Sequence, residues 1–268
     1  MKNLDAYKLK WIAIIGMVAN HAVISWWEII PTWLAFPLYA AGGLTFPIMA
    51  YFVVEGYRHT SNLKRYMLRL FIFGLIALPF HFLAIGMPVA GGNPGIYPWL
   101  NIMFTIIFSL IVLVLYDKIK TRALFWLLYV IIIVPVSFIF FEWSTIGVTM
   151  VLLFHIIRNE TARRVVPPIF AGACQLLFGL LSLVGMQHID PAAIGASTDI
   201  LAFNPDFAIV MPTFAIGCVL AAILLKNYNG ERGKRMKWLF YAFYPIHLAV
   251  LAAVALSLGL VSLGMFGL

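Results

Sequence analysis

Apolar residues run along almost the whole chain, and short clusters of charged and turn residues interrupt them. Runs of about 20 apolar residues have the length of a helix that crosses the ~30 Å hydrocarbon core of a bilayer. Dividing the chain at the interruptions predicts about nine such helices, with eight to ten as the range. The weakest boundary is the fifth, where only Glu142 and Trp143 interrupt the apolar run. The expected ranges are 9–30, 33–57, 66–87, 99–116, 123–141, 143–157, 166–186, 206–225 and 238–265.

The composition supports a membrane protein. The 268 residues are 63% hydrophobic and 10% charged, and their mean hydropathy is +1.00. An ordinary soluble domain is about 25% charged, so this chain lacks the polar residues to cover a soluble fold. We therefore expect an all-α polytopic transmembrane bundle that forms a single domain over residues 1–268. The first apolar run, Trp11–Ile30, is longer than a signal-peptide core, which indicates a retained first helix.

The charges alternate between the predicted connections. Every Lys and Arg lies before the first predicted helix or around the second, fourth, sixth and eighth connections. This alternation predicts a cytoplasmic N-terminus and an outside C-terminus. The net charge of +8 then reflects topology, and nucleic-acid binding is excluded because no soluble basic face exists. The other connections hold only acidic charges, namely Glu28, Glu142, Asp190, Asp199 and Asp206.

Several polar side chains fall near the middle of predicted helices. Asn20 and His21 lie about 15 Å past the start of the first helix, at 1.5 Å per residue. Tyr244 and His247 have a similar depth and share one face of the last helix, because they are three residues apart. Such groups usually face the bundle interior, where they serve either as interhelical hydrogen bonds or in function. The matching depth of two histidines favours function for His21, whereas Tyr244 fits structural bonding better.

A second polar group lies at the predicted cytoplasmic end of the second and third helices. Glu55 and Arg58 are three residues apart, which allows an ion pair. Arg65 and Arg69 share a helix face, and the planar fork of an arginine suits phosphate groups. The pair therefore suits a diphosphate or a 3′-phosphate in a cytoplasmic cavity, while Lys64 is better explained as a solvated anchor.

Other candidate residues give weaker signals. His81, Asn101 and Thr105 lie near the predicted outer ends of the third and fourth helices, and structural pairing and substrate contact are equally good explanations. Cys174 and Cys218 are read as small apolar core residues, and their spacing fits no zinc site. We expect no metal, and the sequence contains no glycine-rich phosphate loop, nucleophile elbow or HExxH motif.

Four segments resemble the TraX family, whose best-known member acetylates a conjugative pilin at its N-terminus. The segments are LKWIAIIGMVANH at 9–21, FPIMAYFVVEGYRHT at 46–60 with the arginines that follow, NIMFT at 101–105, and FYPIHL at 243–248. The family looks like a branch of membrane-bound acyltransferases that use acyl-CoA. The sequence departs from its pattern at Asn20, where an Asp usually precedes the histidine, and at His81, which replaces an acidic residue. An asparagine can orient a histidine but cannot stabilise an imidazolium as a carboxylate does.

The resemblance implies a membrane-bound acetyltransferase of the bacterial inner membrane, with cytoplasmic acetyl-CoA as donor. His21 is then the general base, and an amine or hydroxyl of a peptide, saccharide or lipid is the acceptor. A secondary transporter or channel with a midplane polar site is the main alternative, and a structural assembly factor is the third. The implied catalytic residues are His21, Asn20, His247 and Tyr244; the coenzyme contacts are Arg58, Lys64, Arg65 and Arg69; the substrate contacts are Glu55, His81, Asn101 and Thr105.

Overall fold

The structure is a computed structural model that describes residues 3–85, 100–138, 142–188, 205–234 and 236–260. The regular elements of these residues are helices. In chain order they are α1 (Ala6–Ser25), α2 (Thr32–Gly42), α3 (Thr45–His59), α4 (Leu63–Ile85), α5 (Ile102–Lys118), α6 (Arg122–Phe138), α7 (Ser144–Ile156), α8 (Glu160–His188), α9 (Pro205–Val210), the 3-10 turn η2 (Met211–Thr213), α10 (Phe214–Lys226) and α11 (Lys237–Ser257).

Within the described residues each predicted apolar segment contains helix, which confirms the all-α class. The helix of the first segment ends at Ser25 and that of the last at Ser257. Positions 86–87, 99, 139–141 and 261–265 of the predicted segments lie outside the described residues. Two segments predicted as continuous are broken: 33–57 forms α2 and α3, and 206–225 forms α9, η2 and α10. Among the described residues, five helical stretches are long and apolar enough to cross a membrane, and the count of nine spans and the orientation of the termini stay predictions. The five are Thr32–His59, Leu63–Ile85, Glu160–Val184, Phe207–Lys226 and Trp238–Ser257.

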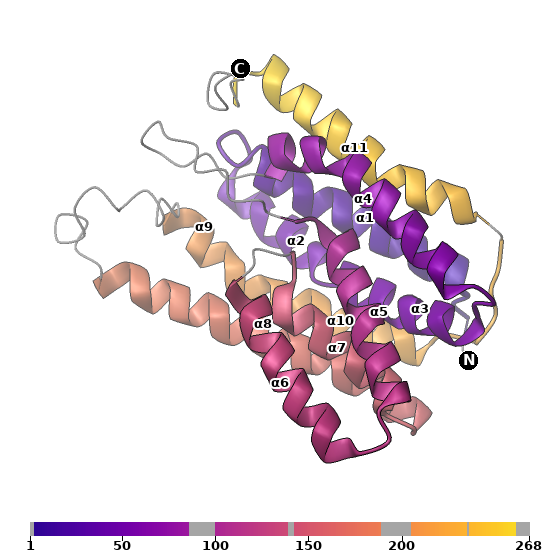
Figure 1. The fold of residues 1–268 in the computed structure, drawn as a ribbon. Coiled ribbons are helices and arrows are strands. Elements are labelled where there is room, and N and C mark those ends of the chain that lie inside the picture. The colour runs from indigo at the N-terminus through magenta and orange to yellow at the C-terminus, as the bar shows by residue number, and fades with distance from the viewer. Residues whose placement is uncertain (1–2, 86–99, 139–141, 189–204, 235, 261–268) are drawn as a thin grey trace.

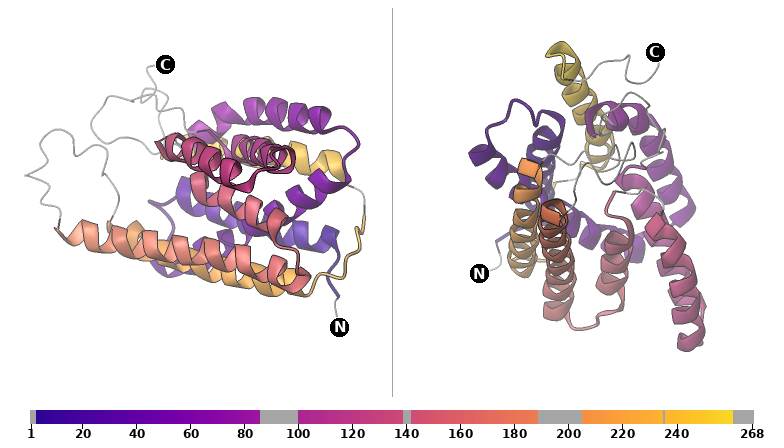
Figure 2. Two further views of the ribbon diagram at one scale, coloured as in Figure 1. Left: turned by 60° about the horizontal axis from the view of Figure 1, so that its bottom comes forward. Right: turned by 90° about the vertical axis from the view of Figure 1, so that its left-hand side faces the viewer.

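The helices pack into one bundle in which partners are often distant in sequence. The final helix α11 lies along α4, and α8 runs beside α10 (Figures 1 and 2). The first helix contacts α2, α3, α4 and α11, so it lies at the centre of one half of the bundle. Apolar side chains on the outer faces of α6, α8 and α11 stay exposed, for example Leu127, Leu181 and Val250. These faces suit contact with lipid, because helices satisfy their backbone hydrogen bonds internally.

The break between α2 and α3 occurs where α10 crosses the chain. Gly42 ends α2 and Gly43 follows it, and glycines are poor helix formers. A β-carbon on Gly43 would lie 2.0 Å from the carbonyl oxygen of Phe214, and one on Gly217 would lie 2.0 Å from that of Ala40. The close approach of two backbones therefore requires glycine on both sides of the crossing.

Replacing Gly217 with Ala should destabilise the protein, because the new methyl group meets backbone atoms that cannot move away independently. We expect a cost of about 1–3 kcal/mol and a melting temperature in detergent lower by several degrees. The matched control is Gly56→Ala in α3, where the nearest atoms belong to the Tyr66 ring at 3.4 Å or more. That control should melt at or above the unaltered protein, and equal losses in both variants would contradict the crossing as the cause.

Candidate active site

A cavity of about 710 Å³ extends along one face of α1. Its α1 lining follows the helical repeat, from Tyr7 through Lys10, Ile14 and Met17 to His21. Fourteen residues separate Tyr7 from His21, which corresponds to roughly 21 Å of helix. The cavity therefore reaches from the end of the bundle that carries the N-terminus to the interior, and its volume is in the range of about 300–1,000 Å³ that is usual for small-molecule sites.

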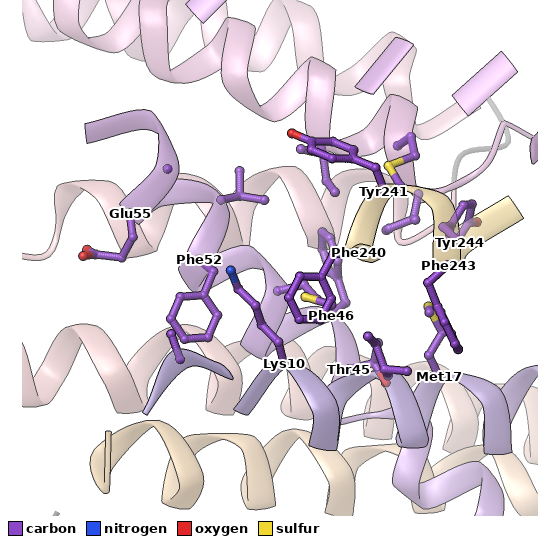
Figure 3. Close-up of a pocket in the computed structure, with 18 of the residues that line it drawn as sticks. Lys10, Met17, Thr45, Phe46, Phe52, Glu55, Phe240, Tyr241, Phe243 and Tyr244 are labelled. Carbon is purple, nitrogen blue, oxygen red and sulfur yellow. The ribbon is translucent and has the colours of Figure 1, made fainter. Parts of the chain in front are cut away.

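The mouth of the cavity is rich in cations. Lys10 holds its ammonium 5.0 Å from the ring centre of Phe52 and 5.3 Å from that of Phe240 (Figure 3). Arg69 lies over the Tyr241 ring, and its Nε is buried without a hydrogen-bond partner among the described residues. The four cations of the lining are Lys10, Arg69, Arg232 and Lys234.

The carboxylate at the mouth is already paired. Glu55 lines the cavity, but its Oε1 accepts a hydrogen bond of 3.1 Å from Arg163, which also pairs with Glu160 at 3.0 Å. Burial, with smaller contributions from Tyr51 and Glu55, raises the pKa of the neighbouring Tyr228 to about 12, so this residue is a neutral hydroxyl at physiological pH. Because Glu55 is already paired and Tyr228 is uncharged, neither neutralises the cations at the mouth, and these cations can bind an anion.

Only one of the four predicted coenzyme contacts lines the cavity. Arg69 does so, whereas Lys64 and Arg65 are exposed on α4 beyond the mouth. Arg58 donates to the backbone oxygen of His155 at 2.9 Å and lies 3.8 Å from Glu55. Sequence reasoning missed Lys10, although its spacing from His21 on α1 carried the signal, and it missed Arg232 and Lys234 in the connection before α11.

At the inner end of the cavity, α1 and α11 bring two histidines together. His21 Nδ1 lies 2.9 Å from His247 Nε2, and the rings stack with centres 5.1 Å apart. His247 Nδ1 lies 3.0 Å from the backbone oxygen of Phe243, which can only accept. His247 therefore donates through Nδ1 and accepts from His21 at Nε2. This leaves Nε2 of His21 as the nitrogen that can exchange a proton in the cavity.

A carboxylate that the sequence did not single out faces that nitrogen. Glu142, taken from the sequence only as a helix boundary, places Oε1 3.4 Å from His21 Nε2. Its Oε2 accepts from the backbone N–H of Ile102 at 2.9 Å and from the hydroxyl of Tyr244 at 3.0 Å, and it lies 3.5 Å from His81 Nε2. Both Glu142 and Tyr244 line the cavity, whereas His81 and His247 lie behind it.

The local backbone turns Glu142 inward. Trp143 has φ of 64°, a left-handed conformation that is uncommon for a bulky residue. Its ring packs 4.9 Å from that of Phe46 and 5.5 Å from that of Phe214. Thr105 donates from its hydroxyl to the backbone oxygen of Glu142. Packing on both sides of the turn thus stabilises a conformation that is unfavourable for the isolated residue.

Two other predicted site residues have different settings. Asn101 caps α5: its Oδ1 accepts from the Met103 N–H at 3.1 Å, and its Nδ2 donates to the Gly74 oxygen at 2.8 Å. Asn20 lines the cavity and packs against Gly42, and its amide nitrogen has no hydrogen-bond partner within the described part of the chain. Asn101 and Thr105 lie outside the lining, so both support the site from behind.

The TraX protein family model matches residues 6–255, almost the whole described chain. The chain belongs to the TraX family. It is also 28% identical over 266 residues to the probable fimbrial assembly protein FimC, serogroup H1, of Dichelobacter nodosus, and this alignment covers 96% of the chain and 99% of that protein. No solved structure matches the chain.

Membership of the TraX family confirms the resemblance seen in the four sequence segments. All four segments contribute directly to the cavity, because α1, α3 and α11 line it and so do Ile102 and Met103 at the start of α5. The segment at 101–105 also supplies the N–H of Ile102, which donates to the carboxylate of Glu142, and Asn101, which caps the same helix. The several long apolar helices agree with an integral membrane protein.

Replacing Asn101 with Ala should destabilise the start of α5, because it leaves the buried N–H of Met103 unpaired and removes the bond from α5 to the Gly74 carbonyl of α4. We expect a loss of about 2–3 kcal/mol in unfolding free energy, measured as a lower melting temperature in detergent. Asn159 is a matched control, since its Oδ1 accepts from Ala162 at the exposed start of α8. The Asn159→Ala variant should lose about 1 kcal/mol, because water replaces the bond. Equal decreases in melting temperature for the two variants would contradict the larger structural role that we assign to Asn101.

Proposed function

We propose that this TraX-family protein is a membrane-bound acetyltransferase that takes the acetyl group from acetyl-CoA. The observation that carries the proposal is one cavity that joins a group of four cations to Nε2 of His21. A donor for such a cavity needs an anionic head and a reactive group at the end of a long neutral arm.

Acetyl-CoA has this distribution of charge. Its phosphates fit the cations at the mouth, and its neutral pantetheine arm leads to the thioester. Eleven residues separate Lys10 from His21 on α1, or roughly 16 Å, and an extended pantetheine arm is of similar length. The lining between them is mainly apolar and includes Ile14, Met17 and Phe243. An apolar passage of this kind limits water near the thioester and so limits hydrolysis.

The proposed transfer needs one base. The nitrogen or oxygen of the acceptor attacks the thioester carbonyl while His21 Nε2 takes its proton. The bond between carbonyl carbon and sulfur then breaks, and the proton passes from His21 to the departing thiolate. The products are the acetylated acceptor and free CoA, with no oxidant, reductant or metal required. Asn20 lines the cavity and is placed to bind the acceptor or the carbonyl group, while the hydroxyl of Tyr244 donates to Glu142.

The acceptor is an amine or hydroxyl of a peptide, a saccharide or a lipid at the membrane, and the bacterial inner membrane is the proposed location. Similarity to a probable fimbrial assembly protein makes a pilin-like N-terminus one acceptor to test. A transporter would exchange substrate across liposomes without acetyl-CoA. Counterflow of substrate in liposomes, with no release of CoA, would therefore contradict acetyl transfer and indicate a transporter.

Replacing His21 with Ala should abolish transfer while acetyl-CoA still binds, because the residue removed lies at the reacting end and not at the mouth. The assay measures CoA release by purified protein with a short peptide, ethanolamine, glucosamine or glycerol as acceptor. We expect kcat to fall at least 10²-fold, in line with the loss of a general base, and the heat-stability shift caused by acetyl-CoA to persist. A His21→Ala variant with unchanged kcat would disprove the assigned role.

Arg69 and Arg65 provide a matched test of the donor site, since both are arginines on α4 and only Arg69 lines the cavity. Arg69→Ala should raise the Kd for acetyl-CoA about tenfold, the effect of losing one charge-assisted contact. Arg65→Ala should change Kd less than twofold. Titration by calorimetry measures both Kd values. A larger increase in Kd for Arg65→Ala than for Arg69→Ala would contradict the cavity mouth as the site of the phosphates and would favour Arg65 as the contact.

A further inference from the structure

We propose that Glu142 is the positioning carboxylate of the site, which acts through His21 by stabilising the imidazolium formed during transfer. This inference rests on the proposed function and assigns a role to a residue between α6 and α7. The feature that carries it is the placement of the two carboxylate oxygens, one toward His21 and the other on donors from neighbouring helices.

The first oxygen faces the proton-exchanging nitrogen. Oε1 of Glu142 lies 3.4 Å from Nε2 of His21, which is longer than the usual 2.7–3.2 Å of an N–H···O bond. Nε2 is therefore not committed to Glu142 and stays open to the acceptor. When His21 takes the proton, the carboxylate lies beside the new positive charge. A charge inside an apolar bundle is costly unless an opposite charge lies close to it.

The residue next to the other ring nitrogen of His21 cannot supply that opposite charge. Its Nδ1 faces His247, whose own Nδ1–H is held by the oxygen of Phe243. His247 is thus a neutral acceptor that fixes the tautomer and orientation of His21. Glu142 is the carboxylate within reach of His21 among the described residues.

The second oxygen is held by donors from two helices, and a third helix places a histidine beside it. The Ile102 N–H, at the start of the 17-residue helix α5, and the Tyr244 hydroxyl of α11 both donate to Oε2. His81 of α4 contacts the same oxygen at 3.5 Å. A helix N-terminus favours a negative charge, because its N–H groups and macrodipole point toward the anion. These contacts keep Glu142 ionised and aim Oε1 at His21.

The test compares Glu142→Gln with Glu142→Asp in the CoA-release assay. The glutamine variant keeps the shape but loses the charge, so we expect kcat to fall about 10²-fold or more while the Kd for acetyl-CoA changes less than twofold. The aspartate variant restores the charge on a shorter side chain and should recover at least tenfold of that loss. A glutamine variant with wild-type kcat, or an aspartate variant no better than glutamine, would overturn the proposal.

Asp117→Asn is the matched control. Asp117 also bonds a histidine and a tyrosine, His155 at 2.8 Å and Tyr57 at 2.7 Å, but it lies outside the cavity lining. This variant should leave kcat unchanged, and a loss equal to that of Glu142→Gln would overturn the assigned role.

Two further outcomes are decisive. If Glu142→Gln fails to fold, Tyr244→Phe removes one donor to Oε2 and keeps the charge: a severalfold lower kcat at constant Kd supports the proposal, and an unchanged kcat overturns it. Failure of the unaltered protein to release CoA with any acceptor would instead overturn the transfer function, and this inference with it.

Discussion

The placement of the Glu142 carboxylate beside His21, with 3.4 Å between Oε1 and Nε2, is the contact on which the arrangement of the site depends. A carboxylate inside an apolar bundle requires donors, and Glu142 has them in Ile102 of α5 and Tyr244 of α11, with His21 of α1 and His81 of α4 close by. Since α1 and α11 lie near opposite ends of the sequence, the need to satisfy one charge helps to fix how the helices pack. The turn at Trp143, with its left-handed backbone, belongs to the same constraint because it aims the carboxylate inward.

With Glu142 at its inner end, the cavity has opposite charges at its two ends. Its mouth holds Lys10, Arg69, Arg232 and Lys234, while its inner end holds a carboxylate with imidazole groups. An anionic group is therefore attracted to the mouth and repelled from the inner end, which agrees with the direction of entry that we propose for the donor. This asymmetry suits a substrate whose reactive group lies far from its charges, as the thioester of acetyl-CoA does.

The sequence predicts periodic features better than contacts between distant segments. Depth along a helix placed His21 and His247 at one level, and the structure brings their ring nitrogens to 2.9 Å. Glu142 was missed because its partners lie in segments up to 121 positions away in sequence, and no local pattern connects them. Arg65 and Arg69 share a face of α4, but the step of four residues from one to the other rises about 6 Å along the helix axis, and that distance leaves Arg65 beyond the mouth. The sequence predicts continuous helix through Gly42 and Gly43. The break between them is not visible in the sequence, because it is required by a tertiary contact, the crossing of α10.

Asn20 shows why adjacency in sequence is a poor guide to chemistry on a helix. Consecutive residues of an α-helix point about 100° apart, so residue 20 cannot lie in line with the ring edge of His21. The structure agrees, since Asn20 packs against Gly42 and has no hydrogen bond to His21. A carboxylate that faces Nε2 has to come from another segment, and Glu142 does so. The absence of an acidic residue at position 20 therefore does not leave His21 without a negative partner, and Asn20 remains free to contact whatever enters the cavity.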